Sequence, residues 1–338
     1  MQSTRKIRAA REALLNIRRR DGAAQRSAKM LAAGEALAKL SDATQLLACR
    51  VSADRLILGC DDIYMALLLG LKGYRRTRSA WLRRKRPTDF LPYRRITVLK
   101  NTKNSSQIFI YTERNSPKLE AYRIILVPDD AVGQEPRVVR SVLECIETPP
   151  RIALLEVALD FPDGSGIDGG FVRRHGLFGK CKPYSVGKRP GWDAWGSRKG
   201  AKFVRSYHKT EVGAHRVELQ LQPPFLRQHG IKEISDFPRL AKILPRHHVW
   251  FARLSEPKLA RAMRKGGTTQ TRIQEIRSGI STRAGHLCGV ARYLRRTAGL
   301  ENVRRLSVPL GVNEAIREAL KAWAGEWSTA PTQSKGKP

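Results

Sequence analysis

The chain has 338 residues and carries 64 Lys and Arg against 30 Asp and Glu, a formal net charge of +34. Hydrophobic residues make up 41% of the chain, which excludes a disordered basic tail and predicts a folded protein with a strongly cationic surface. Such a surface attracts polyanions, and nucleic acid is the partner favoured over an anionic membrane face.

Three further classes are disfavoured by simple patterns. The longest apolar run, residues 63–71, has about half the length that a membrane-spanning helix needs, so we expect no membrane partner. The basic N-terminus has no apolar stretch followed by a small-residue cleavage site, which predicts that the protein is not secreted. Five scattered cysteines without a C-x-x-C pair favour buried or idle thiols over a zinc or disulfide framework.

The first hundred residues are rich in basic groups. Apolar residues at three- and four-residue intervals predict a basic amphipathic helical arm over 3–50 and a second helical patch over 63–72. Residues 71–100 then hold eleven Lys or Arg and one acid, Asp89, which is too unbalanced for a salt-bridged helix face. A solvated linker is the alternative, but we expect phosphate contacts from Arg75, Arg76, Arg78, Arg83, Arg84, Lys85 and Arg86.

The period of the pattern changes after residue 95. Alternation of apolar and polar residues predicts strands, and apolar residues at helical spacing ended by two prolines predict a helix. The expected elements are a hairpin over 96–110 around an Asn/Ser-rich turn, a strand over 121–127, a helix over 138–146, a central strand over 152–161 and a turn over 164–170.

Residues 171–200 interleave cations with aromatic side chains. A single nucleic acid strand needs this combination, because phosphates take cations and bases stack on flat apolar faces. The alternative places these aromatic side chains in the core. The residues expected to contact DNA here are Arg173, Arg174, Lys188, Arg189, Trp192, Trp195, Arg198 and Lys199.

The remainder of the chain, from about residue 226 to Trp327, has a helical pattern. We expect Asn313 to cap the last helix, and the polar tail that follows to be disordered. The pattern thus divides the chain into a basic helical region, 1–90, a core with strands, 91–225, a basic helical region, 226–327, and a tail, 328–338.

Two alternating segments flank the short turn 211–214 and predict a second hairpin. A loop centred on that turn sets Tyr207 opposite Glu218 and Arg205 opposite Gln220, so that a tyrosine, a carboxylate and an arginine share one face. The other face is apolar and faces the core: Val217, Leu219 and Leu221.

The predicted central strand carries Glu156 and Asp160 on one face. Carboxylates on a buried strand are costly unless they are paired or bound to metal. The two lie roughly 13 Å apart, so only one of them can join Glu218 in holding an Mg²⁺ or Mn²⁺ ion. Pairing with the abundant arginines is the alternative. A metal here would polarise a scissile phosphate that Tyr207 attacks, leaving a phosphotyrosyl intermediate.

The order of four short motifs resembles the replication initiation factor family, the rolling-circle initiators of plasmids and filamentous phages that are related to relaxases of conjugative elements. The resemblance covers roughly residues 91–225. Its motifs are Leu-Glu-Val-Ala-Leu-Asp-Phe at 155–161, Trp-Gly-Ser-Arg-Lys at 195–199, Val-Arg-Ser-Tyr-His-Lys at 204–209 and Arg-Val-Glu-Leu at 216–219. The chain departs from the family pattern at Glu156, His208 and Gln220.

The resemblance implies an α+β fold, in which a mixed or antiparallel nuclease-like sheet is flanked by helices and followed by a helical C-terminal lobe. It implies nicking of one strand at an origin, with Tyr207 as nucleophile, Arg205 and Lys209 beside it on the catalytic strand, and Glu156, Asp160 and Glu218 as candidate ligands of Mg²⁺ or Mn²⁺. It also implies a cytoplasmic protein of a prokaryote that acts on duplex origin DNA and single strands, with a homodimer and host proteins such as a helicase as expected partners.

Two other functions stay open from the sequence. One is a non-catalytic DNA- or RNA-binding protein of a mobile element on the same scaffold, with Tyr207 in a structural role. The other is a basic interaction protein of a ribonucleoprotein. Covalent trapping of DNA on Tyr207 distinguishes the nickase from both, because a binder shows only salt-sensitive association.

Overall fold

The computed structural model describes residues 49–82, 92–129, 133, 135–178, 191–281, 287–300 and 302–328. Almost all of the predicted N-terminal helical arm and the polar tail lie outside these ranges. The same holds for six cations predicted to contact DNA: Arg83, Arg84, Lys85, Arg86, Lys188 and Arg189. Within the described ranges, the helices are either too short or too polar to cross a membrane.

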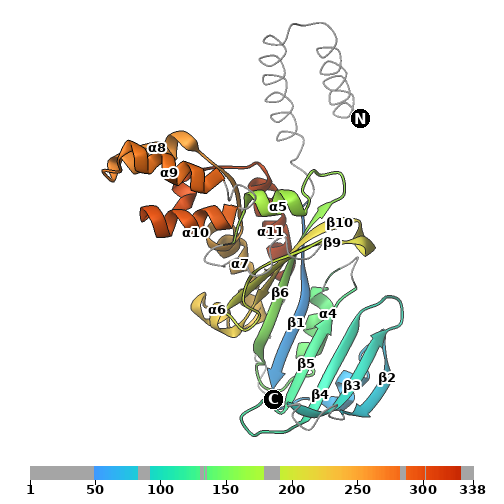
Figure 1. Ribbon diagram of the computed structural model, residues 1–338. Coiled ribbons are helices and arrows are strands. Elements are labelled where there is room, and N and C mark those ends of the chain that lie inside the picture. Colours follow the sequence, from blue (N-terminus) through green and yellow to red (C-terminus); the bar gives the residue numbers. More distant parts are fainter. Residues whose placement is uncertain are drawn as a thin grey trace, which may run out of the picture.

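A nine-stranded antiparallel sheet, in the order β2-β3-β4-β5-β1-β6-β10-β9-β8, forms the framework (Figure 1). Together with the helices around it, this sheet makes the fold α+β, as predicted. Its strands are β1 (Arg50–Cys60), β2 (Tyr74–Trp81), β3 (Tyr93–Asn101), β4 (Gln107–Arg114), β5 (Tyr122–Val127), β6 (Arg151–Pro162), β8 (Trp192–Gly196), β9 (Lys202–Lys209) and β10 (Ala214–Leu221).

The elements predicted between residues 96 and 161 are confirmed, with small shifts in their bounds. The β3–β4 hairpin turns through the Asn/Ser-rich segment, and β5 and β6 match the next two predicted strands. The helix predicted over 138–146 is α4 (Pro136–Glu144), which turns Val139 and Val142 into the core. Alternation is a reliable guide for β4 and β5 because each of them buries every second residue.

The sheet also includes β1 and β2, which lie before residue 91 in a region for which the sequence predicted helix. Only α3 (Met65–Leu69) is helical within 49–82. The central strand β1 lies between β5 and β6. Its sequence lacks strict alternation for two reasons. Residues other than the apolar Leu56 and Leu58 are also buried, and a bulge lies near Asp54. Helical patterning was therefore the wrong interpretation for 50–60 and 74–81.

The apolar face of the sheet is covered by helices from the second half of the chain, which share one core with β1, β6 and β10. The helical elements after β6 are α5 (Gly169–His175), η1 (Thr210–Val212), α6 (Pro223–Gln228), η2 (Ile234–Arg239), α7 (Leu240–Ile243), η3 (Leu244–His248), α8 (Glu256–Lys265), α9 (Gln270–Ser281), α10 (Leu287–Ala298), η4 (Val303–Leu306) and α11 (Val312–Ser328). The long helix α11 contributes Ile316, Leu320, Trp323 and Trp327 to this core.

The predicted helical C-terminal region is helical for most of its length but contains two short strands. Strand β11 (Trp250–Leu254) pairs with β7 (Gly176–Leu177) on one side and with β12 (Ser307–Pro309) on the other. Helices α8, α9 and α10, which Figure 1 shows beside the end of the sheet, build a second, smaller core with Leu259, Met263 and Leu294.

Asn313 has a different role from the predicted helix cap. Helix α11 begins one residue earlier, and the buried Asn313 amide instead binds the edge of β11. Its Oδ1 accepts from the backbone N–H of Phe251 at 2.8 Å, and its Nδ2 donates to the Phe251 carbonyl at 2.6 Å. One side chain thus joins the C-terminal helix to the small sheet.

Replacing Asn313 by Ala is expected to lower the free energy of unfolding by about 2 kcal/mol, because the backbone N–H of Phe251 loses its amide partner, whereas the Phe251 carbonyl still accepts from the backbone N–H of Leu310. Chemical denaturation measures the change. The matched control is Glu318→Ala on the exposed face of α11, which is expected to stay within about 0.5 kcal/mol of the parent. Equal unfolding midpoints for the two variants would contradict this role of Asn313.

Candidate active site

The polar residues of β9 and β10 gather on one face of the sheet, as predicted, but with a different register. Tyr207 lies opposite Arg216, and Arg205 lies opposite Glu218. The prediction was off by two residues because the loop runs from Thr210 to Gly213, one residue earlier than expected, and ends on Gly213 with a positive φ of 58°. A shift of two residues keeps every side chain on its face, so Tyr207, Arg205 and Glu218 still share one patch.

Glu218 is the centre of this patch. Its side chain is fully buried, and both carboxylate oxygens have partners on β9. Nε of Arg205 donates to Oε1 at 3.0 Å, and the Tyr207 hydroxyl donates to Oε2, also at 3.0 Å. Burial, followed by the negative charge of Glu218, raises the pKa of Tyr207 well above its usual value, so the phenol is held in its protonated form at rest.

Glu156 lies on β6 on the same face as Glu218 and is also fully buried. Its Oε1 accepts from Nε2 of Gln220 at 2.5 Å and lies 3.6 Å from Nη1 of Arg55. Its Oε2 is buried and has no hydrogen-bond partner in the described part of the chain. Burial, reinforced by the charge of Glu218, raises the pKa of Glu156 to about 7.

Asp54, which was not among the predicted residues, completes an acidic cluster. The pairing of β1 with β6 shifts between Ala53 and Arg55, so a bulge brings Asp54 to the polar face together with Arg55. Asp54, Glu156 and Glu218 each offer a carboxylate oxygen, and the three oxygens lie within 4.8 Å of one another. The feature that brings Asp54 to the cluster is a bulge, and an alternating sequence pattern does not predict a bulge.

The structure places Asp160 apart from this cluster in a buried ion pair. Arg216 donates to its two oxygens from Nε at 2.6 Å and from Nη2 at 2.7 Å. The remaining Nη1 of Arg216 donates to Oδ1 of Asp54 at 2.5 Å, and Nζ of Lys209 lies 3.8 Å from the same oxygen. The alternative of pairing with arginine thus describes Asp160, whereas Glu156 retains an oxygen without a partner.

The three carboxylates fit a hard divalent cation. Mg²⁺ and Mn²⁺ prefer oxygen ligands, and one or two carboxylates with water complete their usual protein sites. Two observations on the protein itself support the fit: the orphaned buried Oε2 of Glu156, and the elevated pKa of Glu156 that follows from its burial and from the charge of Glu218. A cation would supply both the missing partner and the missing positive charge.

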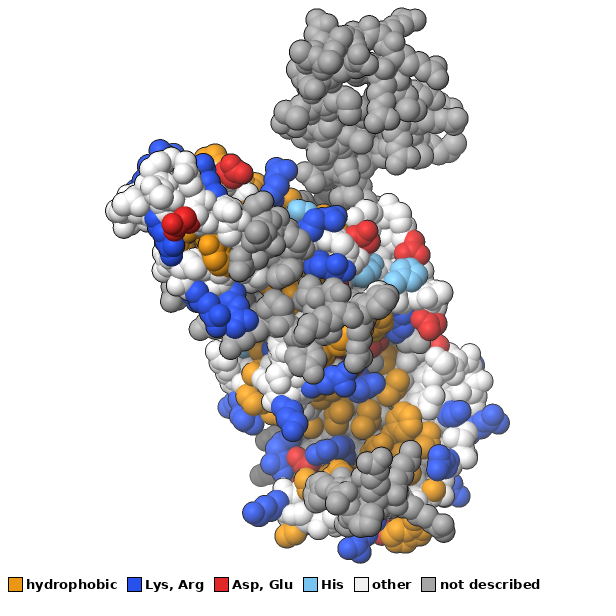
Figure 2. All heavy atoms as spheres, in the orientation of Figure 1, with side chains coloured by type: hydrophobic (Ala, Val, Ile, Leu, Met, Phe, Trp, Pro, Cys, Tyr) orange, Lys and Arg blue, Asp and Glu red, His pale blue; other side chains and the backbone are white. Residues whose placement is uncertain are grey.

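The residues predicted to contact DNA fall in separate places. Arg75, Arg76 and Arg78 are exposed on β2, and Arg198 and Lys199 are exposed just after β8. These strands are opposite edges of the sheet, separated by roughly 38 Å at the usual strand spacing, so the two groups do not form one patch. Figure 2 shows Lys and Arg side chains spread over the described surface, with few acidic ones among them.

Four other residues that were predicted to contact DNA lie on or near β8. Arg174 is exposed, whereas Arg173 donates to Asp193 at 3.2 Å. Trp192 is half-buried opposite Tyr207 on β9. The Trp195 ring is fully buried and packs against Phe178, with 4.6 Å between ring centroids. The core interpretation is therefore correct for Trp195, because a ring in that position is not available to stack on a base.

Comparisons with known proteins found a likeness among solved structures alone. No family model matches the chain, and none of the curated proteins matches it either. Among solved structures, the chain is similar to a rolling circle replication initiator protein from Geobacillus stearothermophilus, with a TM-score of 0.37 and 13% sequence identity over 62% of this chain and 89% of the other. With similarity at this level, the case for a function depends on this chain's own residues.

Mn²⁺ is expected to raise the melting temperature by several degrees, because an ion at a hundred times its Kd stabilises the folded state by about 2.7 kcal/mol. Glu156→Gln should abolish most of this shift while leaving the metal-free melting temperature unchanged or higher, since it removes a buried charge next to Glu218. The control is Asp163→Asn, an exposed acid paired with His208 outside the cluster, which should keep the full shift. An Mn²⁺ shift that persists in Glu156→Gln would place the ion elsewhere.

Proposed function

We propose that this protein is a rolling-circle replication initiator that nicks one strand of origin DNA, with Tyr207 as nucleophile. The observation that carries the proposal is the hydrogen bond from the Tyr207 hydroxyl to Glu218, a member of the acidic cluster. The order of the motifs around Glu156, Tyr207 and Glu218 supports it from the sequence. The net charge of +34 supports DNA as the partner.

The arrangement suggests how the nucleophile is activated. The bond between the Tyr207 oxygen and phosphorus forms as the bond from phosphorus to one deoxyribose oxygen breaks, and the released sugar oxygen takes up a proton. Oε2 of Glu218 is placed to accept the phenol proton, because it already accepts the Tyr207 hydrogen bond. A metal held by Asp54, Glu156 and Glu218 would supply Lewis-acid polarisation of the phosphate.

Two basic residues on β9 have supporting roles in this proposal. Arg205 holds Glu218 in place through Oε1, so that Oε2 faces Tyr207. The guanidinium carbon of Arg205 also lies 5.8 Å from the centre of the Tyr207 ring. The Lys209 side chain lies near Asp54 at the rim of the cluster, where it would contribute positive charge beside a bound phosphate.

A second candidate function is a non-catalytic nucleic-acid-binding protein, and the ion pairs favour it. Arg55, Arg205 and Arg216 each contact a carboxylate of the polar face. Paired charges of this kind can hold a sheet together without any reaction. In this second function, Tyr207 only donates a hydrogen bond to the buried Glu218 carboxylate. The protein then binds DNA or RNA without forming a covalent adduct.

Incubation of the protein with Mn²⁺ and a mixed pool of single-stranded oligonucleotides is expected to produce a denaturation-resistant protein–DNA adduct. Tyr207→Phe should abolish the adduct with little change in binding, because only the hydroxyl is lost. Tyr184→Phe is the matched control, a tyrosine of the basic 171–200 segment, and should still form the adduct. An adduct that survives in Tyr207→Phe and maps to another residue would remove Tyr207 as nucleophile.

Glu218→Gln tests the proposed proton acceptor. The amide keeps the size of the side chain but accepts no proton, so the rate of adduct formation is expected to fall by about 10²–10⁴-fold while oligonucleotide affinity changes little. Single-turnover kinetics with saturating oligonucleotide measure the rate separately from binding. Parental rates in Glu218→Gln would mean that Glu218 only pairs with Arg205.

A further inference from the structure

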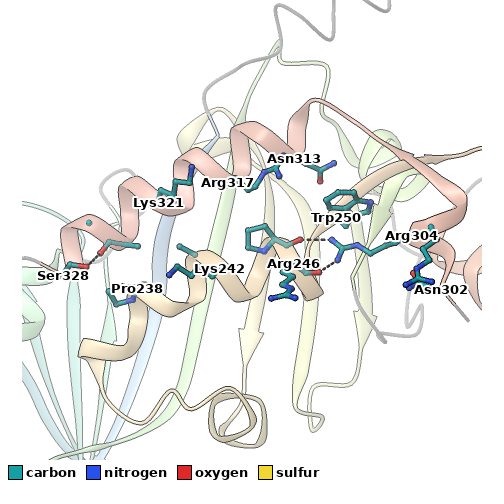
Figure 3. A pocket seen from close by; sticks show the side chains of 15 residues that line it. Pro238, Lys242, Arg246, Trp250, Asn302, Arg304, Asn313, Arg317, Lys321 and Ser328 are labelled. Carbon is teal, nitrogen blue, oxygen red and sulfur yellow. Dashed lines mark hydrogen bonds between the residues drawn. The ribbon is translucent and has the colours of Figure 1, made fainter.

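A groove of about 880 Å³ runs between α7 with its continuation η3 on one side and α11 on the other. Figure 3 shows the two helical segments side by side, with Lys242 and Arg246 on the first and Arg317 and Lys321 on the second. A second hollow of about 670 Å³ lies on the same helix α7 and shares Pro238 and Lys242 with the groove. The hollowed surface therefore continues along α7.

The described lining of the groove contains six cations and no acid, the other two cations being Arg304 and Arg305. Lys242 and Arg246 are four residues apart, as are Arg317 and Lys321, so each wall presents a pair on one helical face. All four side chains are exposed. Lys242 and Arg246 have no ion-pair partner among the described residues, so the first wall presents uncompensated charge.

The second wall carries nearby acids on its outer side. Arg317 pairs with Glu314, and Lys321 pairs with Glu318 at 2.6 Å, both within α11. These pairs are exposed, and exposed pairs of this kind contribute little to stability. Arg317 and Lys321 can therefore leave these acids and bind an anion in the groove with little loss of free energy.

The floor of the groove is flat and partly apolar. The Arg304 guanidinium lies over the Trp250 ring, 4.1 Å from its centre, and donates to the backbone carbonyl of Pro245 at 2.7 Å. These contacts fix the guanidinium in one plane. A fixed plane of this kind, next to Pro245, is a surface on which a nucleobase can stack.

We propose that this groove binds a single strand of nucleic acid, with its phosphates on the two cationic walls and its bases toward the Arg304–Trp250 floor. Single-strand sites combine a cationic groove with flat stacking surfaces, which is the combination present here. A duplex is too wide to enter a space between two packed helices. The inference rests on the proposed function only in that both take nucleic acid as the partner.

The groove and the acidic cluster lie on opposite sides of the sheet. Glu218 and Glu156 are on the polar face, whereas Val217 and Leu219 on the other face share the core with α7 and α11. A strand in the groove therefore does not reach Tyr207 directly. The proposed site is a second binding surface, able to hold a strand away from the nicking site.

Fluorescence anisotropy of the full chain with a labelled twelve-residue oligo-dT, in EDTA and at several salt concentrations, tests the groove without any cleavage. The test variant is Lys242→Glu with Arg246→Glu. The control is Arg261→Glu with Lys265→Glu, an exposed pair at the same spacing on α8 and outside the groove, with the same change in net charge.

The groove variant is expected to bind at least about tenfold more weakly than the parent, and its plot of log affinity against log salt should be shallower by about 1.4, for two lost phosphate contacts. The α8 control should lose much less affinity and keep the parental slope. Equal losses in both variants, parental binding by the groove variant, or equally good competition by duplex DNA would each overturn the proposal. Because EDTA removes the metal, none of these outcomes depends on the Tyr207 adduct.

Discussion

Charge compensation on the polar face of β1, β6 and β10 is the constraint on which the rest of the sheet depends. The buried carboxylates of Glu156, Asp160 and Glu218 lie on central strands, where an unpaired charge costs several kcal/mol. Arg216 is itself buried and binds both oxygens of Asp160, which locks β10 against β6. A slip of one residue would turn these groups into the apolar core, so the ion pairs and the apolar face specify the same register.

This compensation is complete at one end of the polar face and incomplete at the other. Asp160 has two charged hydrogen bonds and no remaining need for a cation. Glu156 has one oxygen with partners and one without, and it lies against Glu218. If the polar face served only to stabilise the sheet, a hydrogen-bond partner for that oxygen would add stability. The missing partner of Glu156 near Tyr207 is therefore better explained by a chemical role of the site than by stability.

The sequence predicts those parts of the fold and site in which one face of a strand is apolar and the other carries polar residues. β6 and the β9–β10 hairpin have this pattern, and Glu156, Glu218 and Tyr207 are found from it. β1 is buried centrally and bulged, so its strand and Asp54 are not found by alternation. The exact pairing partner of Tyr207 depends on which loop residue takes the positive φ. The burial of Trp195 depends on its packing against Phe178, a tertiary contact that a local pattern does not show.

Asp54, Glu156 and Glu218 are proposed to hold a divalent ion next to the Tyr207 hydroxyl. Anomalous diffraction at the manganese edge, from crystals grown with Mn²⁺, locates such an ion directly. One anomalous peak is expected at about 2.0–2.3 Å from oxygens of the three carboxylates. Manganese peaks at full occupancy that lie only elsewhere, with the arginine pairs of the polar face unchanged, would contradict this site.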